Sequence, residues 1–268
     1  MNPRPLGCKP SVHTPELPAL NHQLPLLHFN LLELFLSRSH VGIAMRPVKA
    51  VVFDLDGTLM ESGIDYEKMG NRIRDLLVSM GLPEPLEDRR KVYRVIRGGA
   101  TTLREYGLPE ASLVVTIAEM EAIMNSVELE GLEAITLKPY AREAIAELHG
   151  EGLCLGIATR SHREYAIHSL ERYDLLRFFH RVVARDDVPY PKPDPRHLLY
   201  TIELLGVEPG DTLFIGDTTT DLQTADAAGV GFVGYWRDDA WAQRLMEEGC
   251  SRIIKDLREI PRLVKGSA

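Results

Sequence analysis

Cysteine is scarce in this sequence, and its few cysteines form no metal-binding or disulfide pattern. Cys8, Cys154 and Cys250 lie far apart, with no Cys-x-x-Cys pair and no histidine at the spacing of a zinc site. An odd number of scattered cysteines is typical of a reducing compartment. We therefore predict a cytoplasmic protein without a disulfide framework.

Long apolar runs and an excess of positive charge are also lacking. The apolar part of the N-terminal region, residues 24–36, is interrupted by Pro25, His28, Asn30 and Glu33, and is too short and too polar to cross a bilayer. The formal net charge is −8, which disfavours nucleic acid and anionic membranes as partners. We therefore expect neither a nucleic-acid partner nor a membrane association.

Residues 1–44 differ in composition from the rest of the chain. They are rich in proline, leucine and histidine, and Glu16 and Glu33 are their only acids. Glu33 breaks the apolar part and no small-residue cleavage site follows closely, so the segment is a poor signal peptide. Met45 stands just before the first expected strand, as a natural chain start would. We predict that residues 1–44 are a disordered leader, with targeting to an organelle as the alternative because acids are so few.

The chain of 268 residues alternates expected strands and helices, with one long interruption. Its hydrophobic content of 44% and charged content of 26% are ordinary for a globular protein, and its length fits a core with a smaller insert. Strand-like runs occur at residues 49–53, 153–158, 181–184, 212–215, 230–233 and 251–254. Strands separated by helices imply right-handed crossovers. The predicted fold is therefore α/β, with a Rossmann-like parallel sheet and helices on both faces.

Two of the expected helices begin with recognisable capping signals. Ser161-His162-Arg163-Glu164 fits a Ser-x-x-Glu capping box, in which His162 is the second residue. Asp194-Pro195 fits an N-cap followed by proline at the first helical position. These signals predict helices that start directly after an expected strand or turn.

The interruption between residues 65 and 124 has helical rather than strand periodicity. Apolar residues recur three and four positions apart, and glycine-containing breaks separate the segments. The apolar positions are Ile73, Leu76, Leu77 and Met80, then Val92, Val95 and Ile96, then Leu113, Val114, Ile117, Met120 and Ile123. We predict a small all-helical insert of three or four helices over residues 63–138, and a core made of residues 45–62 and 139–268.

Two aspartates stand at the end of the first expected strand. In Val51-Val52-Phe53-Asp54-Leu55-Asp56-Gly57-Thr58-Leu59, an apolar run ends in two carboxylates one residue apart. Such a pair repels itself and is costly to bury, unless a cation lies between the two groups. An ordinary strand-to-turn transition is the alternative, since aspartate is a common turn residue.

Polar groups at three further strand–helix junctions favour the cation. Ligands of open α/β sheets bind at the carboxyl ends of the strands. The additional groups are Thr159-Arg160, Lys192 in Pro191-Lys192-Pro193, and Gly216-Asp217 through Asp221. Carboxylates there can hold Mg²⁺, an aspartate can attack phosphorus, and lysine and threonine can bind the transferred oxygens. The helix after Ser161 could add backbone N–H groups. The pattern predicts phosphoryl transfer.

At these residues the sequence resembles the haloacid dehalogenase-like hydrolase superfamily, in its phosphatase branch with a helical cap (phosphoglycolate phosphatase-like). Residues 53–59 match the first family motif, Thr159 the second, Lys192 the third and residues 216–221 the fourth, in order and at family-like spacing. The resemblance runs from about residue 48 to the C-terminus. The helical insert lies where this family places its cap.

The resemblance implies a role for each matching residue. Asp54 would be the nucleophile and a Mg²⁺ ligand, and Asp56 the general acid and base, with its backbone carbonyl on the metal. Thr159 would bind the phosphoryl group, and Lys192 would offset its charge. Asp217 would be a metal ligand. The role of Asp221 stays open between a metal ligand and a group that orients Lys192.

Two positions near the motifs depart from the family pattern, and two arginines of the insert are candidates for substrate binding. Arg160 follows Thr159 where many relatives carry a small polar residue, and either binds a substrate anion or points to solvent. Glu61 stands where many relatives have aspartate, so a role facing substrate is doubtful. In the insert, Arg94 and Arg97 beside Gly98-Gly99 are the candidates for binding an anionic substrate, because a glycine pair permits a bend and close approach.

The function predicted from the sequence is a Mg²⁺-dependent phosphatase that hydrolyses a small phosphomonoester. The expected partner is a phosphorylated small molecule, and the expected state is a monomer or small homo-oligomer. The resemblance makes Asp56 an argument against dehalogenation, which needs no proton donor. A phosphomutase that uses the same motifs is the alternative, followed by a non-catalytic binding protein on the same fold.

Overall fold

A parallel sheet of six strands forms the centre of the computed structural model, which describes residues 47–82 and 89–266. The order across the sheet is β5-β4-β1-β6-β7-β8. The strands are β1 (Ala50–Phe53), β4 (Cys154–Ala158), β5 (Arg181–Val183), β6 (Thr212–Gly216), β7 (Gly231–Tyr235) and β8 (Ile253–Ile254). The chain extends the sheet from β1 through β4 to β5 and then returns to the other side of β1. This reversal places the carboxyl end of β1 at a topological switch point.

The central strand is buried on both faces, as its unbroken apolar sequence predicts. Val51 and Phe53 belong to one hydrophobic core, whereas Ala50 and Val52 belong to a second core on the other face. In β1, Val51 lies level with Leu155 of β4 and with Leu213 of β6. The alternating side chains of one strand therefore hold both helical layers against the sheet.

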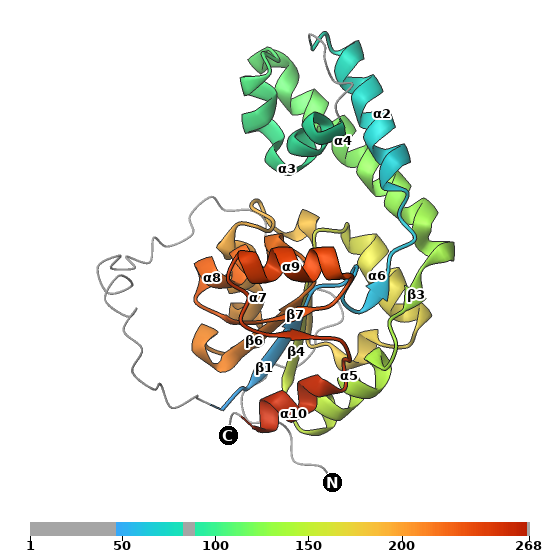
Figure 1. Cartoon of the computed structure of the whole chain (residues 1–268). Helices are drawn as coiled ribbons and strands as arrows, with labels where there is room; N and C mark the ends of the chain where they lie inside the picture. Colours follow the sequence, from blue (N-terminus) through green and yellow to red (C-terminus); the bar gives the residue numbers. More distant parts are fainter. Residues whose placement is uncertain (1–46, 83–88, 267–268) are drawn as a thin grey trace, which may run out of the picture.

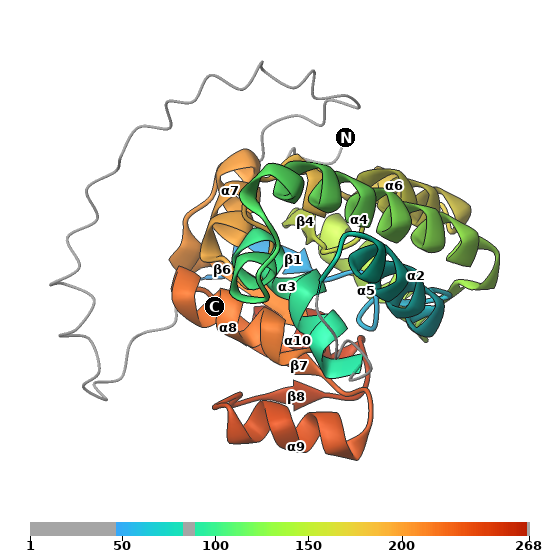
Figure 2. The ribbon, with the colours of Figure 1, turned by 90° about the horizontal axis from the view of Figure 1, so that it is seen from above.

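Helices cover both faces of the sheet (Figures 1 and 2). One face carries α5 (Ala141–Gly150), α6 (Arg163–Arg172) and α10 (Glu259–Lys265), whose apolar residues join the core of Val51 and Phe53. The other carries α7 (Pro195–Leu205) and α8 (Thr219–Ala228), and α9 (Asp239–Glu247) lies beside α8. Asp194 caps α7 by accepting from the N–H of Arg196, as predicted, and Gly229 ends α8 in a left-handed conformation.

The helical insert lies beyond the carboxyl edge of the sheet (Figure 1). It consists of α2 (Tyr66–Ser79), α3 (Arg89–Glu105) and α4 (Glu110–Glu130), followed by the 3-10 helix η1 (Gly131–Ala134). Asp65 caps α2, which buries Met69, Ile73 and Leu77 at helical spacing. Helix α3 bends at Gly99, where the backbone is not helical (φ 48°, ψ −131°). The glycine pair thus produces the bend that the sequence allows.

A short antiparallel ladder, which the sequence pattern did not predict, joins the insert to the core. Strands β2 (Met60–Glu61) and β3 (Thr136–Leu137) pair where the chain leaves and re-enters the core. Glu61 forms an ion pair with Lys138 there, so its side chain is engaged at the base of the insert. Just above the ladder, the backbone of Gly63 touches that of Gly131: a Cβ on Gly63 would lie 2.2 Å from the Gly131 carbonyl oxygen.

The structure confirms the predicted α/β fold and the helical insert, and corrects one detail. Val114 was expected on the apolar face of its helix, but its side chain is exposed. The buried face of α4 instead contains Leu113, Thr116, Met120 and Met124. These residues are three or four positions apart and share one face of the helix, and Val114, one position after Leu113, lies off that face. Residues 1–44, predicted to be a leader, lie outside the described residues. Within the described part of the chain, no helix combines the length and apolarity needed to cross a membrane.

The contact between Gly63 and Gly131 leads to a test of the base of the insert. We expect Gly63→Ala to lower the free energy of unfolding by roughly 1–3 kcal/mol, because the new methyl group overlaps a backbone carbonyl that cannot rotate away. Gly70→Ala in α2 is the matched control, since a Cβ added there would have no neighbouring atom within 4 Å. It should stabilise the protein by up to about 1 kcal/mol through helix propensity. Urea unfolding of both variants measures the difference, and equal effects would contradict the close contact.

Candidate active site

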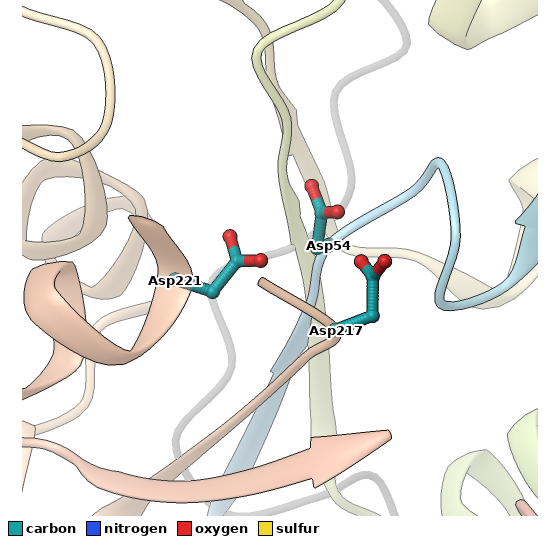
Figure 3. Close-up of side chains that lie close together, drawn as sticks. All are labelled: Asp54, Asp217 and Asp221. Atoms are coloured by element: carbon teal, nitrogen blue, oxygen red, sulfur yellow. The ribbon is translucent and has the colours of Figure 1, made fainter. Parts of the chain in front are cut away.

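Three of the predicted site residues meet where adjacent strands end. Asp54 follows β1, Thr159 follows β4 and Asp217 follows β6, and β1 lies between the other two strands. Asp221 joins them from the first turn of α8. Figure 3 shows the carboxyl groups of Asp54, Asp217 and Asp221 gathered at this edge. The structure therefore brings together residues that are up to 167 positions apart in the sequence, from Asp54 to Asp221.

Lys192 is buried between two of these carboxylates. Its Nζ donates to Oδ1 of Asp54 and to Oδ1 of Asp221, both at 2.6 Å. Burial lowers the pKa of Lys192, but the two carboxylates more than offset this effect and the pKa lies above its ordinary value. Lys192 is therefore a fixed positive charge against the side chain of Asp54. Burial and the neighbouring acids raise the pKa of Asp54 well above its usual range, although Lys192 opposes this.

Both carboxylate oxygens of Asp221 accept hydrogen bonds from the protein. Oδ1 accepts from Lys192, and Oδ2 accepts from the hydroxyl of Thr218 at 2.6 Å and from its N–H at 3.1 Å. The second set is a capping box at the start of α8, with Thr218 as N-cap and Asp221 at the third helical position. Asp221 thus links the start of α8 to Lys192.

Asp217 lies against the turn that follows Asp54. A Cβ on Gly57 would lie 2.3 Å from Asp217 Oδ2, and Gly57 has φ of +88°, so glycine is required there for two reasons. The hydroxyl of Thr58 donates to Asp217 Oδ1 at 3.2 Å. Burial and the charge of Asp221 raise the pKa of Asp217 to about 7, although Arg237 and Lys192 lower it. The raised pKa of Asp217 shows that the nearby positive charges do not offset its burial and the charge of Asp221.

The acidic group fits a divalent cation. Asp54, Asp217 and Asp221 each offer a carboxylate oxygen, and these atoms lie within 4.8 Å of one another. All three residues are buried, and Lys192 provides one positive charge against them. Oxygen ligands from carboxylates are those that Mg²⁺ prefers. The excess negative charge and the donor atoms therefore suit a divalent cation.

Asp56 lies in a different environment from Asp54, although one residue separates them. Its Oδ1 accepts from the Tyr165 hydroxyl at 2.7 Å, and its Oδ2 accepts from the Ser161 hydroxyl at 2.6 Å. Burial raises the pKa of Asp56 to about 6, while these hydrogen bonds favour the ionised form. The sequence predicted that the two aspartates are not equivalent, but it did not identify Tyr165.

The predicted capping box at residues 161–164 is wrong. His162 is the N-cap of α6, and the Ser161 side chain binds Asp56 instead. The N–H of His162 donates to Glu128 Oε2 at 2.8 Å, and the N–H of Arg163 donates to Asp186 Oδ1 at 2.8 Å. Carboxylates from distant segments therefore satisfy these two backbone donors. These two N–H groups are therefore engaged by the protein itself, contrary to the expectation that the start of this helix would offer N–H groups to phosphate.

Glu128 and Arg185 connect the insert to the core, and the sequence pattern did not reveal either. Glu128 belongs to α4 and is buried; its Oε1 accepts from Arg185 at 2.7 Å. Arg185 belongs to the 3-10 helix η3 (Arg185–Asp187) and also donates to Asn125 Oδ1 at 2.6 Å and to the carbonyl of Arg160 at 2.8 Å. The network joins α4 to the loop that carries Thr159.

The predicted substrate-binding arginines belong to two parts of the protein: Arg160 to the core, and Arg94 and Arg97 to the insert. Arg160 is at the carboxyl edge next to Thr159, and its side chain is partly buried. Arg94 lies in α3 with an exposed side chain, 3.6 Å from Glu105 and over the ring of Tyr106. Arg97 lies in the same helix. The roles of Arg160, Arg94 and Arg97 remain predictions.

A buried histidine supports the segment that carries Lys192. The Nδ1 of His197 accepts from the N–H of Lys192 at 3.2 Å, so Nε2 carries the proton and donates to the carbonyl of Val183 at 3.2 Å. His197 is fully buried. Burial and the charge of Lys192 lower the pKa of His197 to about 3, so the ring is neutral. A lone histidine in a helix gave no signal of this role in the sequence.

Comparisons with known proteins agree with this geometry. The model of a family described as haloacid dehalogenase-like hydrolase matches residues 51–235. A phosphoglycolate phosphatase from Pseudomonas putida is 30% identical over 217 residues, which cover 79% of this chain and 78% of that protein. Another from Salmonella typhimurium is 31% identical over 211 residues, covering 71% and 82%. A solved structure of a putative phosphoglycolate phosphatase from Lactobacillus plantarum is 26% identical and superposes with a TM-score of 0.58, covering 81% of this chain and 100% of that one.

Removing the buried lysine should destabilise the fold. Lys192→Met leaves Asp54 and Asp221 buried without their cation, and we expect a loss of roughly 3–5 kcal/mol in the free energy of unfolding. Urea unfolding with EDTA present measures it.

Lys265→Met is the matched control, because Lys265 also contacts two carboxylates, those of Glu147 at 3.1 Å and Glu151 at 2.5 Å, but it lies at the surface and both partners are at least partly exposed. Its loss should be much smaller, because exposed ion pairs contribute little to stability. Equal losses would contradict the importance of burial at Lys192.

The lowered pKa of His197 predicts a pH-dependent contribution to stability. The unfolded protein binds a proton at His197 below about pH 6.5, whereas the folded protein does so only near pH 3. Stability from this residue is therefore present at neutral pH and falls as the pH drops from about 6.5, by about 1.4 kcal/mol per unit. His197→Asn removes this slope while keeping an acceptor for the Lys192 N–H. Urea unfolding at several pH values between about 4.5 and 7 measures the free energy of unfolding of both proteins. The same dependence on pH in both would disprove the burial of a neutral ring.

Proposed function

The chain belongs to the haloacid dehalogenase-like hydrolase family, in its phosphatase branch, and from that membership we propose that it hydrolyses a small phosphomonoester through an aspartyl-phosphate on Asp54. The observation that carries this mechanism is the separation of the two neighbouring aspartates. Asp54 is paired with Lys192, and Asp56 is held by two hydroxyl groups. One carboxylate is thus suited to attack and the other to transfer a proton.

The proposed reaction has two steps. Asp54 attacks phosphorus, the bond to the ester oxygen breaks, and Asp56 gives that oxygen its proton, which releases the alcohol. Asp56 then takes a proton from water as the water attacks the aspartyl-phosphate, which frees inorganic phosphate and restores Asp54. Lys192 and Thr159 bind the phosphoryl oxygens and stabilise the charge that they carry. Lys192 also keeps the carboxylate of Asp54 in place.

We assign the proposed Mg²⁺ to the carboxylates of Asp54 and Asp217 and to the backbone carbonyl of Asp56. When bound, Mg²⁺ would supply positive charge that offsets the negative charge of the nucleophile and of the phosphoryl group. Asp221 contributes to the acidic group, but its main role in this proposal is to orient Lys192, because its oxygens already accept from Lys192 and Thr218. Of the two roles that the sequence left open for Asp221, we therefore propose the orientation of Lys192.

The relatives named phosphoglycolate phosphatase favour a small phosphorylated acid as substrate. Residues 63–138 would act as a cap over the core formed by residues 45–62 and 139–268, and would exclude water during the reaction. Arg160 at the sheet edge, and Arg94 and Arg97 in the cap, are the proposed contacts for the second anionic group. We propose a cytoplasmic enzyme that works as a monomer or small homo-oligomer.

The function is tested by phosphate release from a panel of phosphomonoesters that includes phosphoglycolate. We expect turnover with Mg²⁺, loss of turnover with EDTA, and recovery when Mg²⁺ is added in excess. Asp54→Asn should remove phosphate release while the circular dichroism spectrum stays that of the folded protein, because the nucleophile is lost, the shape is kept and Asp221 still pairs with Lys192.

The matched control is Asp211→Asn, which changes a buried aspartate at the amino edge of β6 that binds Lys49. It should keep phosphate release. Persistent turnover in Asp54→Asn would refute the nucleophile. Conversion of a sugar phosphate to its isomer without free phosphate would establish the phosphomutase instead. Ligand binding without any turnover would favour the non-catalytic protein.

A further inference from the structure

Two hydroxyl groups hold the carboxyl group of Asp56 from the side of α6. Ser161 donates to one carboxylate oxygen at 2.6 Å, and Tyr165 donates to the other at 2.7 Å. Both oxygens of this single side chain therefore have a short hydrogen bond from a neighbouring residue. From this geometry we propose that Ser161 and Tyr165 are positioning residues, which fix the Asp56 carboxyl group for proton transfer to the leaving oxygen. The proposal rests on the proposed phosphatase function.

The tyrosine is buried in the core, with its hydroxyl against the carboxyl group of Asp56 and beside Ser62. The side chain of Tyr165 is fully buried and belongs to the core formed with α5 and α10. The Ser169 hydroxyl donates to the Tyr165 carbonyl at 2.7 Å, one turn further along α6. A buried tyrosine hydroxyl needs a partner, and here that partner is Asp56. Phenylalanine would fill the same space without the hydroxyl, so packing alone does not explain the tyrosine.

The serine acts from the loop that also carries Thr159. The N–H of Ser161 donates to Thr159 Oγ1 at 3.1 Å, while its hydroxyl binds Asp56. Ser161 lies two residues before α6 and Tyr165 lies in its first turn, and both side chains converge on Asp56. One short segment, from Thr159 to Tyr165, therefore carries the proposed phosphate-binding hydroxyl and also holds the proposed proton-transfer group.

Misplacing a general acid has a distinctive effect on substrate preference. An alkyl phosphate would release a strongly basic alkoxide, so its leaving oxygen needs a proton as the bond to phosphorus breaks. An aryl ester such as p-nitrophenyl phosphate releases a weakly basic phenolate and needs the proton much less. The ratio kcat/KM reports the steps up to formation of the aspartyl-phosphate, where this proton is used. A loss of position at Asp56 should therefore lower kcat/KM for alkyl phosphates selectively. A loss of overall folding would lower it for every ester.

The experiment compares Tyr165→Phe, Ser161→Ala and the original protein on p-nitrophenyl phosphate and on an alkyl phosphate that the original protein hydrolyses. We expect each variant to lose roughly tenfold or more in kcat/KM on the alkyl ester, part of the roughly 10²–10⁴-fold that general acid catalysis supplies. On the aryl ester the loss should be about twofold or less. Ser161→Thr keeps a hydroxyl and should restore most of the alkyl activity.

Tyr173→Phe is the matched control, because Tyr173 caps the end of the same helix and its hydroxyl donates to the Ile135 carbonyl at 2.7 Å. It removes an equivalent hydrogen bond away from Asp56 and should leave the alkyl-to-aryl ratio unchanged. Equal losses on both esters in Tyr165→Phe and Ser161→Ala would overturn the positioning role while leaving the phosphatase intact. Failure of the original protein to release phosphate from any ester would instead refute the proposed function itself.

Discussion

The buried lysine between two carboxylates is the constraint on which the site depends. Lys192 could not remain charged in the interior without Asp54 and Asp221, and those carboxylates would repel each other without it. Each member is held by a separate local structure: β1 delivers Asp54, the capping box of α8 fixes Asp221, and His197 binds the backbone of Lys192. The ion pairs therefore tie three segments of the sheet edge into one arrangement, and misplacing one segment would leave a buried charge unpaired.

The same edge separates two aspartates that are nearly adjacent in the chain. In a continuous strand, Asp54 and Asp56 would point to the same face, because side chains alternate with a period of two. The chain instead turns after Asp54, and the buried residues Leu55, Leu59 and Met60 anchor this turn in the core. Asp54 then faces the lysine and the other acids, whereas Asp56 faces the hydroxyl groups of Ser161, in the loop before α6, and of Tyr165 in α6. Burial raises the pKa of both, yet only Asp54 also has a buried cation in direct contact. Two chemically identical side chains acquire different properties because their surroundings differ.

The sequence predicted much of the fold, and the locations of the strand-end residues, because both depend on local patterns. An apolar run that ends in Asp-x-Asp places its carboxylates at a strand end whatever the rest of the chain does. The capping box at Ser161 failed because a nearby carboxylate, Asp56, competes for the serine hydroxyl, and the sequence gives no information about that distance. Tyr165, Glu128 and Arg185 were missed for the same reason, because their partners lie far away in the chain. His197 was missed although Lys192 is only five positions away, because a lone histidine carries no pattern that reveals its partner. The ladder of β2 and β3 has two residues in each strand, too few for a recognisable period.

The loop after β4 connects the proposed chemistry to the insert through contacts on both of its sides. Thr159 and Ser161 face the site, while the N–H of His162 binds Glu128 of α4, and Arg185 bridges Glu128 to the carbonyl of Arg160. Because the ion pair is buried, separating α4 from the core would leave Glu128 or Arg185 without its partner, which is costly. That cost opposes movement of the insert away from the core. The contacts concerned are made by residues 160–162, the same segment whose Ser161 is proposed to position Asp56. The proposed covering of the site and the proposed alignment of its proton-transfer group therefore depend on the same few residues.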